Sequence, residues 1–260
     1  WFELHEKFGS KPMSEILAPA IHYAQNGFPL TELIAWYMHR TVPFFESKGF
    51  PNIEDTYKNQ NGGKLPNEGE IYKNVYLANT YKKIAERGRD VFYKGEIAET
   101  IGKFIKEQGG FLSFKDLASH KSEWVEPVSI NYRGYDVWEL PPNGQGIAAL
   151  QMLKILEGYD FSNIEFGSTE HLHLFTEAKK LAFEDRAKYY ADMDFTAVPL
   201  EQLLSESYAN SRRELIGDKA GLYSAGEISA GETIYMTVAD NKGTMVSLIQ
   251  SNYRGMGSGM

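Results

Sequence analysis

The first 125 residues show hydrophobic positions at helical spacing. Apolar side chains recur every three or four positions, as Leu4 and Phe8 do. Helix-breaking residues such as Gly9 and Pro12 separate these apolar runs. This period places apolar side chains on one face of an α-helix, so a mostly helical region is predicted.

Two further helices in this region have clear sequence boundaries. One is predicted over 75–88 and the other over 95–108, where Gly109 and Gly110 form a strong C-terminal signal. Residues 51–66 are rich in Asn and Gly and are predicted to form an exposed loop.

The pattern changes to alternation between residues 125 and 140. Val128, Ile130 and Tyr132 are separated by single polar residues, which is the period of a half-buried β-strand. Gly134 marks a turn, and extended structure resumes after it. A β-hairpin is therefore predicted near 125–140.

Helical spacing returns after the glycine-punctuated loop 141–146. One helix is predicted over 147–156, a longer one begins at a cap formed by Ser168 or Thr169, and a third is predicted over 203–216. The apolar face of the longer helix is predicted to consist of Leu172, Phe175, Ala178 and Ala182.

A linker and a second β-hairpin are predicted for the last part of the chain. Residues 217–231 contain four glycines and three alanines, a composition typical of a flexible connection. From Thr233 to Ala239 the residues alternate as in a strand. Residues 240–243 form a predicted turn, and 244–250 the return strand.

Composition and charge exclude several classes of function. The 260 residues carry a formal net charge of −8 and no long basic run, which argues against nucleic-acid or anionic-membrane partners. No apolar stretch approaches the roughly 18 residues that suggest a membrane span. The lack of cysteine excludes disulfides, thiolate metal ligands and a cysteine nucleophile. Because the chain begins at Trp1 rather than at a methionine, localisation stays unknown, either cytoplasmic or exported.

The residues with the strongest chemical signal surround the second hairpin. They are Gly231-Glu232-Thr233-Ile234-Tyr235-Met236-Thr237-Val238-Ala239-Asp240 and, after the turn, Ser251-Asn252-Tyr253-Arg254-Gly255-Met256-Gly257-Ser258-Gly259. Together they closely resemble the start of the small subunit in the gamma-glutamyltranspeptidase family. There, a threonine opens a strand that reaches an Asp-x-x-Gly turn and returns to a hydroxyl-bearing, glycine-rich segment. Matching Asp240 and Gly243 to that turn puts Thr233 at the catalytic threonine.

The resemblance continues upstream, in the order expected for the family's large subunit. Its landmarks are Trp1-Phe2-Glu3-Leu4-His5-Glu6-Lys7-Phe8-Gly9-Ser10, Phe92-Tyr93-Lys94-Gly95, Gly109-Gly110 with Asp116-Leu117, Pro141-Pro142-Asn143-Gly144, and Glu177-Ala178 with Asp185-Arg186 and Asp192. This collinearity is more specific than any single motif. It implies that the chain covers much of the large subunit and the start of the small subunit.

The resemblance also implies a fold and a subunit boundary. The fold class is α+β, the four-layer αββα sandwich of N-terminal-nucleophile hydrolases, incomplete in this slice. Residues 1–232 correspond to the large-subunit portion, and 233–260 to the start of the small subunit, within one structural domain. The arginine that pairs with the substrate carboxylate and the residues of the oxyanion hole are expected outside this sequence.

The chemistry of such a site needs a free amine at Thr233. A threonine hydroxyl becomes a nucleophile when a base accepts its proton, and an N-terminal threonine supplies its own α-amine, with a pKa of about 7.7 to 8.0. In this chain Glu232 precedes Thr233, so the sequence is that of a precursor. The resemblance implies autoproteolysis between Glu232 and Thr233, and the linker 217–231 suits a segment that bends into the site and then leaves.

Three residues of the return segment are the other site candidates. By resemblance, Ser251 hydrogen-bonds near the nucleophile and its amine, although a serine that caps a loop is the equally simple alternative. Tyr253 departs from the family, because transpeptidases that act on glutathione typically have asparagine there, contacting the amino-acid end of the gamma-glutamyl group. Asn252 is a neighbouring substitute if the loop shifts.

The predicted reaction is therefore transfer or hydrolysis of a gamma-glutamyl acyl group. The implied partners are a small glutathione-like gamma-glutamyl substrate, water or an amino-acid acceptor, and the two subunits of the same precursor. Two alternatives stay open: a glutaryl-type acylase with the same nucleophile, and a non-catalytic, unprocessed relative that serves as a binding scaffold. No metal or organic cofactor is implied.

Other candidate sites are weaker. His171, His173 and Glu177 share a predicted helix, but residues two apart lie about 200° around the helix axis, which is wrong for joint metal ligation. The segment from Gly144 to Gly146 is better explained as a turn than as an anion cradle. Arg186 is expected to form an ion pair with Asp185 or to lie on a helix surface.

Overall fold

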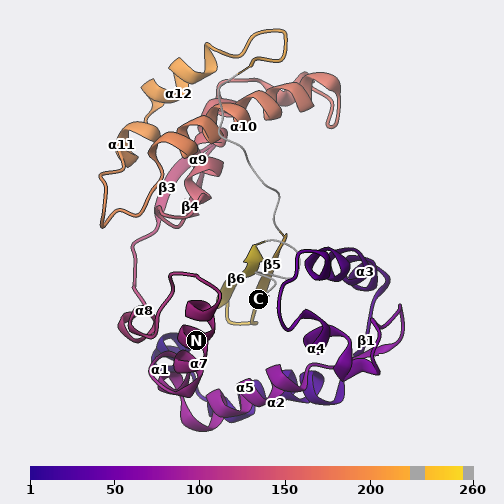
Figure 1. Ribbon diagram of the computed structural model, residues 1–260. Coiled ribbons are helices and arrows are strands. Elements are labelled where there is room, and N and C mark those ends of the chain that lie inside the picture. Colours follow the sequence, from indigo (N-terminus) through magenta and orange to yellow (C-terminus); the bar gives the residue numbers. More distant parts are fainter. Residues whose placement is uncertain (223–231, 254–260) are drawn as a thin grey trace. The chain divides into compact units, whose positions relative to one another are not determined.

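The computed structural model describes residues 1–222 and 232–253, and for 232–235 and 250–253 it describes the backbone alone. The chain divides into two compact units, Trp1–Ser122 with Ser229–Met260, and Glu123–Ile228. We refer to them as the first and second units (Figure 1).

The first unit is mostly helical, as the hydrophobic spacing predicted. Its helices α2 and α5 lie side by side (Figure 1). Met13 and Leu17 of α2 form a buried cluster with Ile84 of α5 and Val91 of α6. The elements of residues 1–122 are α1 (Phe2–Phe8), α2 (Met13–Asn26), β1 (Phe28–Pro29), α3 (Glu32–Ser47), α4 (Ile53–Tyr57), the 3₁₀ helix η1 (Asn59–Asn61), β2 (Ile71–Tyr72), α5 (Val75–Arg87), α6 (Arg89–Tyr93), α7 (Glu96–Glu107) and α8 (Phe114–Ser119).

The prediction of an exposed loop over 51–66 is wrong. This segment contains α4 and η1, and Ile53 and Leu65 are buried with Met38 of α3. The Asn61 side chain makes two hydrogen bonds to the backbone of Lys73. Its Oδ1 accepts from the Lys73 N–H at 2.8 Å, and its Nδ2 donates to the Lys73 carbonyl at 3.2 Å. The Asn and Gly residues therefore shape turns between short helical pieces that two apolar side chains attach to the core.

The second unit is built around α9. Its elements are β3 (Val128–Tyr132), β4 (Tyr135–Glu139), α9 (Gly146–Glu157), the 3₁₀ helix η2 (Phe161–Asn163), α10 (Thr169–Tyr189), α11 (Leu200–Leu203) and α12 (Glu206–Arg213). α9 contacts the β3–β4 hairpin, α10 and α12. Ile147 and Leu150 of α9 are fully buried against Ile130 and Leu203, whereas Ile155 contributes to a separate cluster with α10.

The predicted hairpin near 125–140 is confirmed. β3 and β4 are antiparallel, and Tyr132 pairs with Tyr135 across a two-residue turn. Arg133 and Gly134 both have positive φ, 51° and 90°, which is the conformation that matches the twist of a tight hairpin. The backbone N–H of Arg133 donates to Glu157 at 3.0 Å, so the turn is attached to the end of α9.

The predicted cap of the long helix is confirmed, but another predicted helix is divided in two. Ser168 caps α10 through a hydrogen bond from the His171 N–H at 3.2 Å. The single helix predicted over 203–216 is instead divided, because Ser205 is extended and caps α12 through the N–H of Tyr208.

The apolar face predicted for α10 is also wrong in part. Ala178 and Ala182 are buried, but Leu172 and Phe175 are exposed. The buried face is instead formed by Leu174, Glu177, Ala178, Leu181, Ala182 and Asp185. Two carboxylates therefore lie on the buried side of this helix.

A second hairpin ends the described chain. β5 (Glu232–Ala239) and β6 (Met245–Tyr253) are antiparallel, so the chain combines helices with strands, as expected. Within 1–222 and 232–253 the strands form three two-stranded sheets. No helix in this part of the chain is both long and apolar enough to span a membrane.

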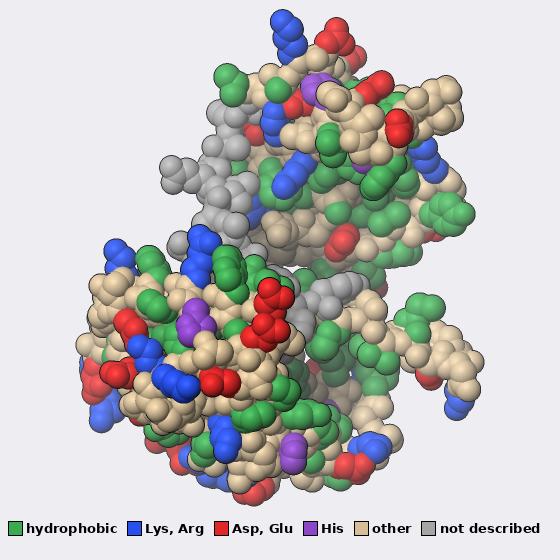
Figure 2. Space-filling model, turned by 90° about the vertical axis from the view of Figure 1, so that its right-hand side faces the viewer, with side chains coloured by type: hydrophobic (Ala, Val, Ile, Leu, Met, Phe, Trp, Pro, Cys, Tyr) green, Lys and Arg blue, Asp and Glu red, His purple; other side chains and the backbone are tan. Residues whose placement is uncertain are grey.

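Large hydrophobic side chains remain exposed in both units. Phe111, Phe166 and Phe195 are 99%, 88% and 89% exposed. Figure 2 shows hydrophobic side chains between charged ones on the face that it displays.

Candidate active site

The predicted nucleophile lies where the register of the β5–β6 hairpin shifts. Ile234 pairs with Gln250, whereas Glu232 pairs with Tyr253. Between these pairs β5 has one residue, Thr233, and β6 has two, Ser251 and Asn252. This two-against-one arrangement is that of a β-bulge, a feature found often beside active sites.

The bulge brings all five predicted site residues to one end of the hairpin. Glu232 and Thr233 belong to β5, and Ser251, Asn252 and Tyr253 belong to β6. The return strand ends three residues later than predicted and includes these last three positions, which were expected in the loop. Most of the predicted linker, 223–231, and the glycine-rich segment from 254 onward lie outside the described residues.

The other end of the hairpin is closed by the Asp-x-x-Gly turn, as predicted. The Asp240 carboxylate accepts hydrogen bonds from the backbone N–H groups of Lys242 at 2.8 Å and Thr244 at 2.9 Å. Gly243 has a φ of 85°, which is a left-handed conformation that glycine adopts without strain. These backbone donors hold the pKa of the Asp240 carboxyl below its usual value. The turn thereby sets which residues of the two strands face each other at the bulge.

The chain that leads toward Thr233 is attached to α10 by contacts that the sequence reasoning missed. His173 Nε2 donates to the carbonyl of Gly217 at 2.7 Å. Glu177 Oε2 accepts from the N–H of Gly221 at 2.9 Å, and Lys180 Nζ donates to the carbonyl of Gly221 at 3.0 Å. The missed signal is the spacing of these three side chains, i, i+4 and i+7, which places them on one helix face.

His171 and His173 have separate surroundings, as the rotation of about 200° between them requires. The His171 ring stacks on Phe175 at 4.6 Å and lies near Phe166, whereas His173 contacts Gly217. Among the residues that the structure describes, no group of three His, Cys, Asp or Glu residues is arranged to hold a metal ion.

Asp185 is the centre of a buried polar network in the second unit. Its carboxylate accepts hydrogen bonds from Gln151 Nε2 at 2.9 Å and Tyr208 Oη at 2.8 Å, and it pairs with Arg212 at 2.9 Å. Burial raises the pKa of Asp185, although these three partners oppose the shift. Burial and the adjacent carboxylate also raise the pKa of Tyr208. The network joins α9, α10 and α12 and is structural.

The partner of Asp185 is therefore Arg212 and not Arg186. The guanidinium of Arg186 lies over the ring of Phe183, 5.3 Å from its centroid. Arg133 donates to the carbonyl of Tyr159 at 2.7 Å, which is a structural contact of the β3–β4 turn. Neither arginine is joined to the hairpin at Thr233 by these contacts.

The segment from Gly144 to Gly146 leads into α9, and the Glu139 side chain lies against Gly146. A Cβ atom at Gly146 would lie 2.3 Å from Glu139 Oε2, so glycine is needed for this carboxylate to approach the helix start. The helix N-terminus favours negative charge, and here Glu139 supplies it. This supports the interpretation of the segment as a structural turn.

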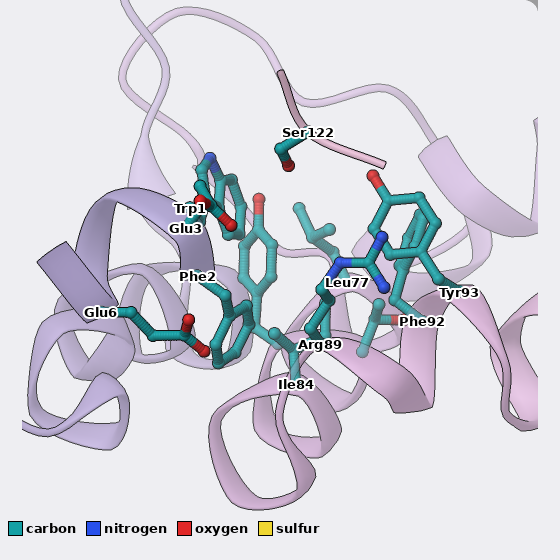
Figure 3. A pocket seen from close by; sticks show the side chains of 12 residues that line it. Trp1, Phe2, Glu3, Glu6, Leu77, Ile84, Arg89, Phe92, Tyr93 and Ser122 are labelled. Carbon is teal, nitrogen blue, oxygen red and sulfur yellow. The ribbon is translucent and has the colours of Figure 1, made fainter. Parts of the chain in front are cut away.

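A separate apolar cavity of about 330 Å³ lies in the first unit. Its lining includes Trp1, Phe2, Tyr81, Phe92 and Tyr93, with the Arg89 guanidinium 4.4 Å from the centroid of the Tyr93 ring. Figure 3 shows Arg89 beside Tyr93, with Trp1 and Phe2 across the cavity. Among the side chains that the structure describes, those that line the cavity belong to residues 1–122.

Comparisons with known proteins show which family the chain resembles. The family model described as gamma-glutamyltranspeptidase matches residues 1–260. The glutathione hydrolase-like YwrD proenzyme of Bacillus subtilis (strain 168) is 37% identical over 99% of this chain and 48% of its own length. The acylase ACY 1 proenzyme of Pseudomonas sp. (strain SE83) is 36% identical over 96% of this chain and 45% of its own length.

A solved structure gives the same result for the fold. The crystal structure of a cephalosporin acylase from Bacillus halodurans superimposes with a TM-score of 0.88 and 41% identity, covering 99% of this chain and 47% of that one. The chain thus spans about half the length of the relatives that it matches. Because the family model matches it from end to end, the chain belongs to the gamma-glutamyltranspeptidase family.

Proposed function

We propose that the protein is an acyl-transfer enzyme whose nucleophile is Thr233, released by autoproteolysis of the Glu232–Thr233 bond. The observation that carries the proposal is the backbone register of the hairpin, in which Thr233 lies at a bulge across from Ser251 and Asn252. The family match over residues 1–260 supports the same assignment.

Cleavage of the precursor uses the Thr233 hydroxyl against its own preceding peptide bond. The hydroxyl oxygen attacks the carbonyl carbon of Glu232, the C–N bond breaks, and the nitrogen takes up the proton. This acyl shift leaves an ester between Glu232 and Thr233. Water hydrolyses the ester, so that Glu232 ends as a carboxylate and Thr233 regains its hydroxyl and acquires a free α-amine.

The free amine then serves as the general base of the mature enzyme. Its reference pKa of about 7.7 to 8.0 is close to neutral pH, so the neutral form that accepts a proton is well populated. The hydroxyl oxygen attacks the substrate carbonyl, backbone donors stabilise the oxyanion, and the amine of the substrate leaves with a proton. Water or an amino-acid amine then releases the acyl group from Thr233. Ser251 is proposed to orient the hydroxyl and amine of Thr233.

The acyl group is proposed to be gamma-glutamyl, carried by a small glutathione-like substrate. Asn252 is the proposed contact for the amino-acid end of this group, because Tyr253 carries a bulky phenol where glutathione-cleaving transpeptidases typically have asparagine. The same feature favours a second candidate, a glutaryl-type acyl group that lacks the α-amine. The acylase named in the comparisons has a similar sequence, which supports keeping this candidate.

The proposed mature protein has a large-subunit portion, 1–232, and a small-subunit portion that begins at 233, joined in one αββα sandwich. Exposure of the hairpin side chains supports a covering layer, because Val238, Met245 and Ile249 are 67%, 79% and 63% exposed. An isolated two-stranded hairpin is at best marginally stable in water. Further strands and helices of the four-layer fold would bury these side chains.

Cleavage is tested on the full-length protein by denaturing electrophoresis and N-terminal sequencing. The expected result is two fragments, the smaller of which begins at Thr233. Thr233→Ala should remain one intact chain, and Thr233→Ser should still be cleaved because it keeps a hydroxyl. A wild-type chain that stays intact and has the same activity as Thr233→Ala would overturn the proposal and leave the non-catalytic binding scaffold as the explanation.

The acyl group is tested with matched gamma-glutamyl and glutaryl anilides. A higher kcat/KM for the gamma-glutamyl anilide supports the first candidate, and a higher value for the glutaryl anilide supports the second. Tyr253→Asn is the diagnostic variant. If Tyr253 disfavours the α-amine, this change should raise the gamma-glutamyl to glutaryl ratio of kcat/KM.

A further inference from the structure

Three Asn-Gly dipeptides occur in the chain, at Asn26-Gly27, Asn61-Gly62 and Asn143-Gly144. The side-chain amide of such an asparagine can be lost without an enzyme, because the backbone nitrogen of the next residue can attack the side-chain carbonyl carbon. Glycine favours this attack, since it has no side chain to obstruct the close approach of its backbone. How firmly the structure holds these two groups therefore decides which of the three dipeptides reacts.

The structure holds the Asn61 side chain in place. Its Oδ1 accepts from the Lys73 N–H at 2.8 Å, and its Nδ2 donates to the carbonyls of Lys73 and Tyr57, both at 3.2 Å. The side chain must leave these partners before the Gly62 nitrogen can reach its carbonyl carbon, and each lost hydrogen bond adds to the barrier. Asn61 is therefore protected.

At Asn26-Gly27 the attacking nitrogen is held. Asn26 is the last residue of α2, and the Gly27 N–H donates to the Tyr23 carbonyl at 2.9 Å. The Asn26 side-chain nitrogen is itself bonded to His22 Nδ1 at 3.0 Å. The backbone also has little room to turn, because a Cβ atom at Gly27 would lie 2.3 Å from Cγ2 of Ile71. Asn26 is therefore protected as well.

Asn143-Gly144 has neither form of protection. Both residues are exposed in the loop that leads into α9. Among the residues that the structure describes, no hydrogen-bond partner is found for the Asn143 side chain or for the Gly144 N–H. A Cβ atom added at Gly144 would meet nothing within 4 Å, so the backbone has room to turn and a ring has room to form.

We propose that Asn143 is a site of spontaneous deamidation. The Gly144 nitrogen bonds to the side-chain carbonyl carbon of Asn143 and gives up its proton, the C–N bond of the side-chain amide breaks, and ammonia leaves with that proton. The cyclic succinimide that remains is opened by water. Opening at the side-chain carbonyl yields aspartate, and opening at the main-chain carbonyl yields isoaspartate, in which the backbone continues through the side-chain carbons. Either product carries an additional negative charge.

The isoaspartyl product changes the backbone at the start of α9. It inserts an extra carbon between Pro142, which is buried, and Ile147, which is 0% exposed. Because only residues 143–146 separate these two anchors, we expect the extra carbon to displace the first turn of the helix, where Gly146 closely approaches Glu139. The first amides of α9 should therefore exchange faster with solvent in the isoaspartyl form.

The test incubates the purified full-length protein in mildly alkaline buffer, since the attacking nitrogen must lose its proton. Peptide mass spectrometry follows the amide, aspartyl and isoaspartyl forms at all three dipeptides. In the folded protein Asn143 should react at least about tenfold faster than Asn61, a factor that three hydrogen bonds supply even at the low end of their usual strength. Asn26 should also lag behind Asn143. In urea the three rates should converge, because the dipeptide is the same and the structure is lost.

Two variants isolate the reacting groups. Gly144→Ala hinders the approach of the nitrogen, and its added methyl group meets nothing in the fold, so deamidation at Asn143 should slow severalfold with an unchanged melting temperature. Asn143→Gln keeps an amide but requires a larger ring, so residue 143 should stay unmodified.

Asn143→Asp is the matched control for the effect on α9. It adds the same negative charge without the extra backbone carbon, and a helix N-terminus tolerates negative charge. Its α9 amides should therefore exchange close to the wild-type rate, whereas those of the isoaspartyl fraction of aged wild-type protein should exchange faster.

The proposal fails if Asn143 keeps its amide in the folded protein, or if it reacts no faster than Asn61 and Asn26. It fails equally if Gly144→Ala deamidates at the wild-type rate. Unchanged α9 exchange in the isoaspartyl fraction would overturn the expected displacement of the helix start. The reaction does not use Thr233, so Thr233→Ala should give the same rates, and failure of the proposed function would leave this result untouched.

Discussion

Gly158 provides a sensitive test of how the second unit is held together. It follows the last residue of α9, and a Cβ atom at this position would lie 2.1 Å from Cζ of Arg213. Arg213 ends α12 and caps α9 by donating to the carbonyls of Ile155 at 2.7 Å and Lys154 at 2.8 Å. We therefore expect Gly158→Ala to displace this guanidinium and uncouple the two helices.

The magnitude follows from two opposing effects. Hydrogen bonds that involve a charged group contribute about 1.5 to 3 kcal/mol each, so losing two of them costs about 3 kcal/mol at the low end of that range. Gly158 has φ −75° and ψ −4°, which alanine adopts without strain, so the substitution also stabilises by about 0.4 to 1 kcal/mol through the unfolded state. The cost of losing these two hydrogen bonds exceeds the stabilisation from alanine, so we expect a net destabilisation of about 2 kcal/mol.

Native-state hydrogen exchange of α9 amides in the full-length protein measures the relevant opening free energy, because it reports on one part of a molecule with several units. In an Arg213→Ala background the clash disappears, so Gly158→Ala should become stabilising, which corresponds to a coupling of about 2 to 3 kcal/mol. Gly144→Ala is the control, since an added Cβ there meets nothing within 4 Å. If Gly158→Ala is neutral or stabilising with Arg213 present, the reasoning is refuted.

Two further predictions concern the buried network and the hairpin turn. Tyr208→Phe should destabilise the second unit by about 1 to 3 kcal/mol, because it removes the 2.8 Å hydrogen bond to the buried Asp185 carboxylate. Urea unfolding checks this against Tyr189→Phe on the same side of the unit, and equal effects would contradict it. The depressed pKa of Asp240 means that its contribution to stability is present above the ordinary aspartate pKa of 3.8 and is lost as pH falls through the lower folded-state value. Asp240→Asn should remove that acid-dependent loss from the exchange rates of β5 and β6 amides, and an unchanged pH profile would count against the assignment.

The helices and hairpins could be predicted because local interactions specify them. Ser168 caps α10 with its own hydroxyl, and Asp240 with Gly243 shapes the turn through bonds within five residues. The candidate site could be predicted for the same reason. Thr233 and Ser251 belong to one hairpin, so alternation and a turn motif bring them together without information from the rest of the chain.

The structure of the segment 51–66 could not be predicted from its local sequence. Its Asn and Gly residues predicted a loop, but Ile53 and Leu65 are buried because Met38 and Val42 of α3 offer them an apolar surface. The composition of such a segment predicts its turns, but it does not predict which part of the protein the segment packs against. The division between α11 and α12 at Ser205 has a local signal, the serine cap, that the longer apolar pattern concealed.

The amino-acid sequence was sufficient to determine the order of helices and hairpins, the presence of Glu232 directly before Thr233, and the meeting of the predicted site residues on one hairpin. Tertiary structure alone decided that the buried face of α10 carries Glu177 and Asp185. A carboxylate can be buried only if donors reach it. Apart from Lys180, which lies three positions from Glu177, these donors come from Gly221, Gln151, Tyr208 and Arg212, 23 to 44 positions away in the chain. Helical periodicity cannot report on partners at that distance, because it records which side chains share a face and not what that face will meet.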